Sequence, residues 1–197
     1  MSKTYYGLEA VKKVEELVGR KLSVPEIRVI EEEGFVDGEY MDDKGIVTRG
    51  VGQTGPYMDM SFEDTFKAHE NIARKLIPAY DELPDLVKGE LAQAAYRSDL
   101  QQSPNFRKLF NAGKYAEAAE EFLDNKDYRD SLVRNNRGEP HGVARRMEAV
   151  ANAVREYGRS LEDKKLEEVP AEELNAEPAY LNKLFDSSVE TVKNLFK

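Results

Sequence analysis

The 197-residue sequence contains no cysteine and only two histidines. Disulfide bonds and thiolate metal sites are therefore excluded. No apolar run approaches the ~20 residues that a membrane-spanning helix needs, and the first residues lack a cationic segment followed by an apolar stretch. We therefore expect a soluble protein with no secretory signal and no membrane insertion.

Acidic residues outnumber basic ones, 38 against 29, which gives a net charge of −9. A chain of this charge has no general attraction to nucleic-acid phosphates, so no nucleic acid is expected as a partner. Residues 161–178 concentrate acids and include two prolines, which is typical of a solvated linker. Apolar residues at helical spacing beyond it predict a C-terminal amphipathic helix.

Apolar spacing elsewhere predicts a mostly helical chain around one small sheet. Ser23 and Glu26 form a capping box that predicts a helix start, and Gly34 predicts its end. Five glycines between positions 38 and 55 separate short β-prone pieces at 40–41, 46–48 and 57–58, which predict an antiparallel sheet. Further helices are expected at 7–18, 61–77, 86–97, 104–113, 116–123 and 142–157.

Two patterns that suggest a cofactor do not fit their templates. The glycines at 50, 52 and 55 follow a predicted strand but lead into another strand, which excludes a dinucleotide-binding loop. The acids that begin at Asp37 do not fit an EF-hand, because Met41 takes the fifth position and no glycine takes the sixth. We expect no cofactor and no metal site.

A pair of carboxylates is the remaining candidate chemistry. Glu33 ends a predicted helix, and Asp42 lies at the first turn of the predicted sheet. Such an arrangement could hold two carboxyl groups across a groove at roughly 6.5–9.5 Å, as inverting glycosidases require. The helix dipole, with Glu31 and Glu32, would raise the pKa of Glu33 and suit it to act as a general acid. The alternative is a solvated acidic helix end followed by an ordinary aspartate turn and a strand residue, Thr48.

The residues around this pair resemble a known family. Glu33-Gly34 and the stretch 40–52, YMDDKGIVTRGVG, match without a gap the Glu and the Tyr-x-Asp-x-x-Gly-x-x-Thr-x-Gly-x-Gly signature of the T-even phage type lysozymes, glycoside hydrolase family 24. Residues 111–119 and 142–148 are similar to further family segments, so the resemblance covers about 23–157. It implies an α+β, mostly helical, two-lobed fold, with a small antiparallel β-sheet lobe, an inter-lobe helix and a helical lobe.

The resemblance also implies an activity. The protein would be a muramidase that hydrolyses the β-1,4 bond between N-acetylmuramic acid and N-acetylglucosamine in peptidoglycan. Glu33 would be the general acid, Asp42 would orient or deprotonate the attacking water, and Thr48 would hold that water. Gln93 and Arg97 match positions where the family often places Asn or Gln on the cleft wall, and would contact the glycan strand.

The sequence departs from the family pattern after the last glycine of the signature, where Gln53 replaces the usual His. Because that His is mainly structural, we expect a local hydrogen bond to be lost or replaced. His69 is expected to be an exposed or packing residue, and His141 a loop residue or a substrate contact. Arg145 and Arg146 are expected to neutralise cleft acids or to pair with surface carboxylates.

Four parts of the chain are expected: an N-terminal helical extension (1–22), a lysozyme-like catalytic domain (23–158), an acidic linker (159–178) and a C-terminal amphipathic helix (179–197). The C-terminal helix would fold back on the lysozyme body, dock a partner such as a phage virion protein, or touch a membrane, and the first helix (7–18) would likewise be an appended docking element. The protein would be an endolysin held in the host cytoplasm until release, or a virion-borne muramidase, and in both cases would act on periplasmic peptidoglycan. The alternative is a non-catalytic phage virion protein that retains a lysozyme fold.

Overall fold

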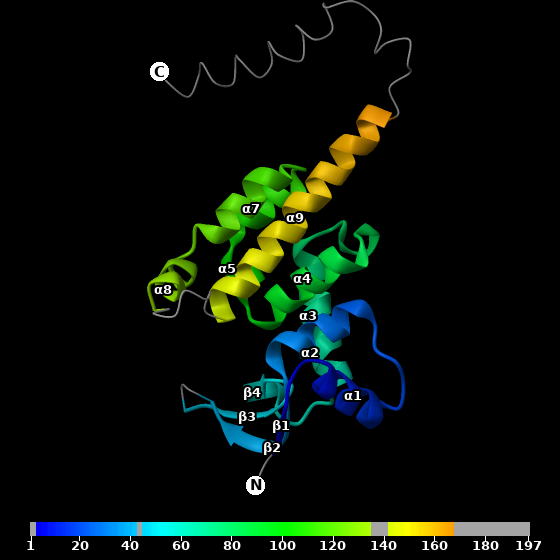
Figure 1. The fold of residues 1–197 in the computed structure, drawn as a ribbon, viewed down its shortest axis with the longest axis vertical. Helices are drawn as coiled ribbons and strands as arrows, with labels where there is room; N and C mark the ends of the chain where they lie inside the picture. Colours follow the sequence, from blue (N-terminus) through cyan, green and yellow to red (C-terminus); the bar gives the residue numbers. More distant parts are fainter. Residues whose placement is uncertain (1–2, 43–44, 135–141, 168–197) are drawn as a thin grey trace, which may run out of the picture. The chain divides into compact units, whose positions relative to one another are not determined.

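The computed structural model describes residues 3–42, 45–134 and 142–167 (Figure 1). The chain divides into two compact units, 1–158 and 159–197, and the second contributes only the last turns of the final helix to the described residues. The predicted helix at 179–197, the linker from 168 onward and His141 lie outside the described residues. Within the described ranges, none of the helices combines the length and apolar character needed to cross a bilayer.

A four-stranded antiparallel sheet forms the N-terminal part of the first unit, with its strands in sequence order. The strands are β1 (Lys3–Tyr5), β2 (Phe35–Met41), β3 (Val47–Gly50) and β4 (Gln53–Thr54). Thr4 pairs with Val36, and Thr48 lies between Tyr40 on β2 and Thr54 on β4. The register of β2 against β3 shifts between Val36 and Glu39, which marks a bulge before the hairpin. The predicted sheet is confirmed, and the first residues of the chain extend it by one strand.

Nine α-helices are present in the described residues. They are α1 (Gly7–Val18), α2 (Val24–Glu33), α3 (Phe62–Leu76), α4 (Asp85–Tyr96), α5 (Asp99–Gln102), α6 (Pro104–Asn111), α7 (Tyr115–Leu123), α8 (Lys126–Arg134) and α9 (Gly142–Glu167). The predicted start signals act as expected: the Ser23 N–H donates to Glu26 at 2.8 Å, and the Asp64 N–H donates to Ser61 at 3.0 Å. The helix α3 ends two residues before Pro78, as predicted.

Helix α3 joins two hydrophobic cores. Phe62 and Phe66, in its first half, pack with α1, α2 and the sheet, whereas Ala73, near its end, packs with the C-terminal helices. Each core therefore forms one lobe, and α3 is the inter-lobe helix that was predicted. The fold is α+β and mostly helical.

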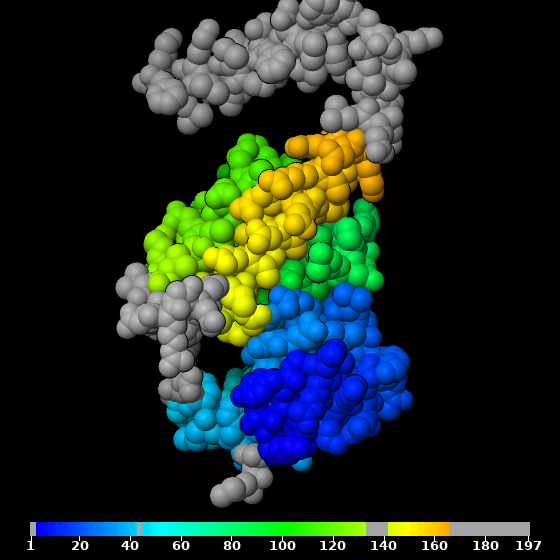
Figure 2. Space-filling model, in the orientation of Figure 1, coloured from blue at the N-terminus to red at the C-terminus, as the bar shows by residue number. Residues whose placement is uncertain are grey.

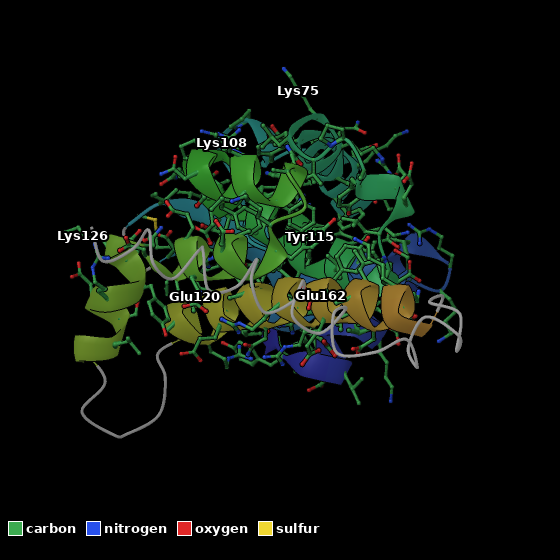
Figure 3. The ribbon with its side chains drawn as sticks, turned by 90° about the horizontal axis from the view of Figure 1, so that it is seen from above. Lys75, Lys108, Tyr115, Glu120, Lys126 and Glu162 are labelled. Carbon is green, nitrogen blue, oxygen red and sulfur yellow. The ribbon has the colours of Figure 1, made fainter. Side chains whose placement is uncertain are left out.

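The helical lobe is closed by α9, which packs against α7 (Figure 3). The Tyr115 ring of α7 lies 5.0 Å from the Tyr157 ring of α9, and Glu120 accepts a hydrogen bond from Arg155 at 2.6 Å. A methyl group at Gly158 would lie 2.7 Å from the Cβ of Tyr115. The absence of a side chain at this point lets the two helices approach closely.

The N-terminal extension is packed into the first unit. Ala10, Val11 and Val14 of α1 are buried in the same core as Val29 and Ile30 of α2. Figure 2 shows α1, in dark blue, on the viewed face of this part of the molecule.

The predicted linker starts as helix, because α9 runs through 159–167. Lys164 and Lys165 lie in its last turn, where their positive charges interact favourably with the negative end of the helix dipole. The first proline of the predicted linker is Pro170, which follows the end of the helix.

His69 is a packing residue. Its ring lies between those of Tyr57 and Tyr96, with 4.5 Å between ring centres on each side, and its Nδ1–H donates to the Thr65 carbonyl at 2.8 Å. Burial lowers the pKa of His69 below its ordinary value of 6.5.

We therefore expect the free energy of unfolding to fall as the pH is lowered from about 7.5 to 5, because there the unfolded chain binds a proton that the folded chain excludes at His69. His69→Phe keeps a ring between the two tyrosines and should flatten this dependence. Urea unfolding at several pH values would check this. An equally steep dependence in the variant would contradict it.

Candidate active site

Glu33 is the last residue of α2, and Gly34 ends the helix with a positive φ of 73°. The Glu33 side chain is 18% exposed, and its Oε1 is buried with no hydrogen-bond partner in the part of the chain that the structure describes. The nearest cation is the Nη1 of Arg97, 3.6 Å from this oxygen. A buried carboxylate oxygen that lacks a hydrogen bond is costly for folding, which marks it as a candidate functional group.

The turn between β3 and β4 lies against the Glu33 carboxylate. A methyl group at Gly52 would be 3.3 Å from Oε2 of Glu33, and Gly52 has a φ of +66°. The backbone conformation therefore favours glycine, and a methyl group would in addition force the Glu33 carboxylate to move. The turn is tied to α4, because the Tyr96 hydroxyl donates to the Val51 carbonyl at 2.6 Å. Burial and the charge of Glu33 raise the pKa of Tyr96, so this hydroxyl stays protonated and keeps donating.

Asp42 and Thr48 are brought together on the β2–β3 hairpin. Asp42 Oδ1 accepts a hydrogen bond from the Ile46 N–H at 2.8 Å, and the Thr48 hydroxyl donates to the Ile46 carbonyl at 3.1 Å. The Asp42 N–H also donates to the Ile46 carbonyl, at 3.0 Å. The two backbone groups of one residue, Ile46, thus orient both side chains, and Glu33 lies against the turn that follows the strand of Thr48.

The charge around Glu33 differs from the sequence-based expectation. Glu32 was expected to add negative charge, but its side chain is 1% exposed and binds two guanidinium groups, Arg28 at 2.7 Å and Arg145 at 2.5 Å. Because Glu32 is paired with two guanidinium groups, one on a partly buried and one on an exposed side chain, it contributes little net negative field at Glu33. Arg145 therefore pairs with a buried carboxylate, and not with one at the surface.

Arg146 is the second guanidinium that approaches Glu33. Its Nη1 donates to the Glu32 carbonyl at 3.3 Å, and its Nε is buried without a partner in the described residues. Burial and the nearby charge of Arg97 lower its pKa, while Glu33 and Glu32 act in the opposite direction. Cations thus approach Glu33 from α4 and from α9.

The two predicted substrate contacts have different environments. Gln93 is 1% exposed on α4, and its Nε2 has no hydrogen-bond partner among the described residues. The Arg97 side chain is 23% exposed at the end of the same helix and borders Glu33. Their contact with a glycan stays a prediction. Sequence reasoning missed Tyr96 and Asp99, which line the same region without belonging to any motif.

Gln53, which takes the position where a histidine was expected, is buried and forms three hydrogen bonds. Its Nε2 donates to the Met60 carbonyl at 2.6 Å and to the Thr65 hydroxyl at 3.1 Å. Its Oε1 accepts from the Val51 N–H at 3.4 Å. The buried amide therefore joins the β3–β4 turn to α3.

Glu90 of α4 holds Arg28 of α2 from the other side, with a distance of 2.5 Å between Oε1 and Nε. Its side chain is 5% exposed and its Oε2 has no partner in the described residues. Burial raises the pKa of Glu90 above its ordinary value of 4.5, although Arg28 opposes the shift.

A carboxyl group whose pKa is higher in the folded than in the unfolded protein contributes less to the free energy of unfolding as the pH rises through the folded-state pKa. We therefore expect the stability of the wild type relative to Glu90→Gln to fall between about pH 4.5 and 7.5. Urea unfolding at these two pH values would measure the difference, with Glu117→Gln as a control that changes an exposed carboxylate. A relative stability that grows with pH would contradict the expectation.

Within the described ranges, no three histidine, aspartate or glutamate side chains are grouped as a metal site would require.

Comparisons with known proteins identify a fold and no family. No family model matches the sequence, and no curated protein matches it. The chain has a phage lysozyme-like fold. Among solved structures, it is similar to the active form of the P1 phage endolysin Lyz, with a TM-score of 0.51 and 15% sequence identity over 77% of this chain and 95% of that one. The predicted fold class is confirmed.

Proposed function

We propose that this protein is a peptidoglycan hydrolase of the muramidase type, a member of glycoside hydrolase family 24, which cleaves the β-1,4 bond between N-acetylmuramic acid and N-acetylglucosamine. The observation that carries the proposal is the buried Oε1 of Glu33, which has no hydrogen-bond partner in the described residues, on a side chain that lies against the β3–β4 turn directly after the strand of Thr48. On the preceding β2–β3 hairpin, the backbone of Ile46 orients Asp42 and Thr48. The endolysin-like fold supports the same substrate.

In the proposed reaction, the Glu33 carboxyl donates its proton to the glycosidic oxygen as the bond from the anomeric carbon to that oxygen breaks. A water molecule attacks the anomeric carbon from the opposite face and transfers a proton to Asp42. Thr48, whose hydroxyl proton is directed to the Ile46 carbonyl, offers its oxygen lone pairs to that water. This single displacement inverts the anomeric configuration.

Arg97 would border the bound glycan next to the proton donor. Its guanidinium carries a permanent positive charge, which suits the lactyl carboxylate of muramic acid or an acidic stem peptide. Gln93, on the preceding turn of α4, would offer the glycan its Nε2 amide group, which has no hydrogen-bond partner among the described residues. Both residues are proposed as substrate contacts.

The biological setting would be phage lysis or cell-wall penetration. An endolysin would wait in the host cytoplasm, whereas a virion component would be carried in the particle, docked to other virion proteins through its terminal segments. Mass spectrometry of purified particles separates these two roles.

The activity is tested by incubating the protein with purified peptidoglycan and identifying the released muropeptides by mass spectrometry. Products that end in a reducing N-acetylmuramic acid are expected. Fragments cut within the stem peptide would contradict the proposed bond specificity. An absence of released fragments would favour a non-catalytic protein that retains a lysozyme fold.

A further inference from the structure

Arg97 is shared unequally between two carboxylates. Its Nε donates a hydrogen bond to Asp99 Oδ2 at 3.3 Å, whereas its Nη1 lies 3.6 Å from Glu33 Oε1 without forming a hydrogen bond. The side chains of Arg97 and Asp99 are each 23% exposed, so solvent screens their interaction only in part. The guanidinium is therefore oriented by Asp99 while it faces Glu33.

The backbone between these two residues is unusual. Ser98 has a φ of 68° and is the one non-glycine residue with a positive φ in the described ranges. Only Arg97 and Ser98 separate the end of α4 from the start of α5, and this tight connection places the side chains of Arg97 and Asp99 side by side. Left-handed conformations of non-glycine residues are unfavourable and concentrate at functional sites.

We propose that Asp99 is a positioning residue that holds Arg97 in its hydrogen bond and prevents it from pairing fully with Glu33. The proposal rests on the function proposed above. A general acid must carry a proton, and a guanidinium in full contact would favour the ionised carboxylate, which cannot donate one. Asp99 thus allows a cation to line the site without disabling the proton donor.

Other charged groups surround this cluster. Glu33 is faced by Arg97 and the Tyr96 hydroxyl from α4, by Arg146 from α9, and by its neighbour Glu32. Glu32 is already bound by two arginines, so it does not compete for Arg97.

Asp99 itself is faced by Arg97 and Arg146, and at longer range by Asp127 from α8. Burial raises the pKa of Asp99, against the opposing effect of Arg97. As the pH rises, Asp99 loses its proton and becomes negatively charged. Its electrostatic attraction for Arg97 therefore grows with pH.

The pH dependence of kcat/KM on soluble peptidoglycan fragments tests this role. In Asp99→Asn, we expect the alkaline limb of the profile to move about one pH unit lower, with a roughly tenfold loss of activity at pH 7. The alkaline limb of the double variant Asp99→Asn, Arg97→Gln should coincide with that of the single variant Arg97→Gln, because Asp99 acts only through Arg97. Asp81→Asn breaks an arginine pair elsewhere, with Arg74, and should leave the limb unchanged.

A second measurement does not depend on activity. The pH at which the Glu33 side-chain carboxyl signal changes in a carbon-13 NMR titration should fall in Asp99→Asn relative to the wild type. An unchanged titration, or an activity loss that is equal at every pH, would overturn the proposed role of Asp99. A shifted titration in a protein that does not hydrolyse peptidoglycan would support the role of Asp99 and contradict the proposed function instead.

Discussion

Replacing Glu33 with glutamine is expected to lower the rate of peptidoglycan hydrolysis by about 10²–10⁴-fold, because a positioned general acid contributes an acceleration of that order. Glutamine has nearly the shape of glutamate, so it should fit against Gly52 and leave the fold intact. The measurement is the initial rate of clearing of a peptidoglycan suspension, together with the thermal unfolding of both proteins.

Glu31→Gln is the matched control for this variant. Glu31 lies two residues earlier on the same helix, and its ion pair with Arg28 is a long contact of 3.8 Å. It should retain almost all activity. Equal loss in both variants would indicate a general effect of charge on α2, and normal clearing by Glu33→Gln would show that Glu33 is not the acid.

Replacing Gly52 with alanine is expected to give the second-largest loss of activity. The methyl group would lie 3.3 Å from the Glu33 carboxylate in a backbone conformation with a φ of +66°. The left-handed conformation alone costs a non-glycine residue about 1–2 kcal/mol. Displacing a reacting group by about 1 Å can cost 10²-fold in rate, so we expect a 10- to 100-fold decrease.

Gly113→Ala separates the backbone strain that Gly52→Ala introduces from the displacement of the Glu33 carboxylate. Gly113 has a φ of +76°, and a methyl group there would meet no atom within 4 Å. Both variants should lose similar stability in urea unfolding, but only Gly52→Ala should lose activity. A comparable activity loss in Gly113→Ala would mean that destabilisation, and not the position of Glu33, explains the effect.

Local signals in the sequence predicted most of the helices. The capping box at Ser23 and the stop at Pro78 act through neighbouring atoms, so a short stretch of sequence contains all the required information. The strand β1 was not predicted, because its three residues gain their stability from pairing with residues 35–37, far along the chain. Residues Tyr57–Met58 were predicted as strand, but Tyr57 ends a 3₁₀ turn that contains Pro56, which has no N–H to give to a sheet.

The candidate site was predictable only in part, because some of its residues are brought together from distant parts of the chain. Glu33, Asp42 and Thr48 lie within 16 residues of one another, and their spacing carries a pattern. The cations that surround Glu33 come from α4 and α9, and their positions depend on how the two lobes pack. No sequence spacing relates Arg146 to Glu33, so the neutralisation of the acidic helix end became visible only in three dimensions.

The stereochemistry of hydrolysis tests the proposed pairing of Glu33 and Asp42 most directly. Proton NMR of a peptidoglycan oligosaccharide during cleavage identifies the first anomer that forms, before mutarotation mixes the two. An acid and a base on opposite faces of the sugar should release the α-anomer from the β-linked chain. Initial release of the β-anomer would require a different arrangement of carboxylates and would contradict the assignment.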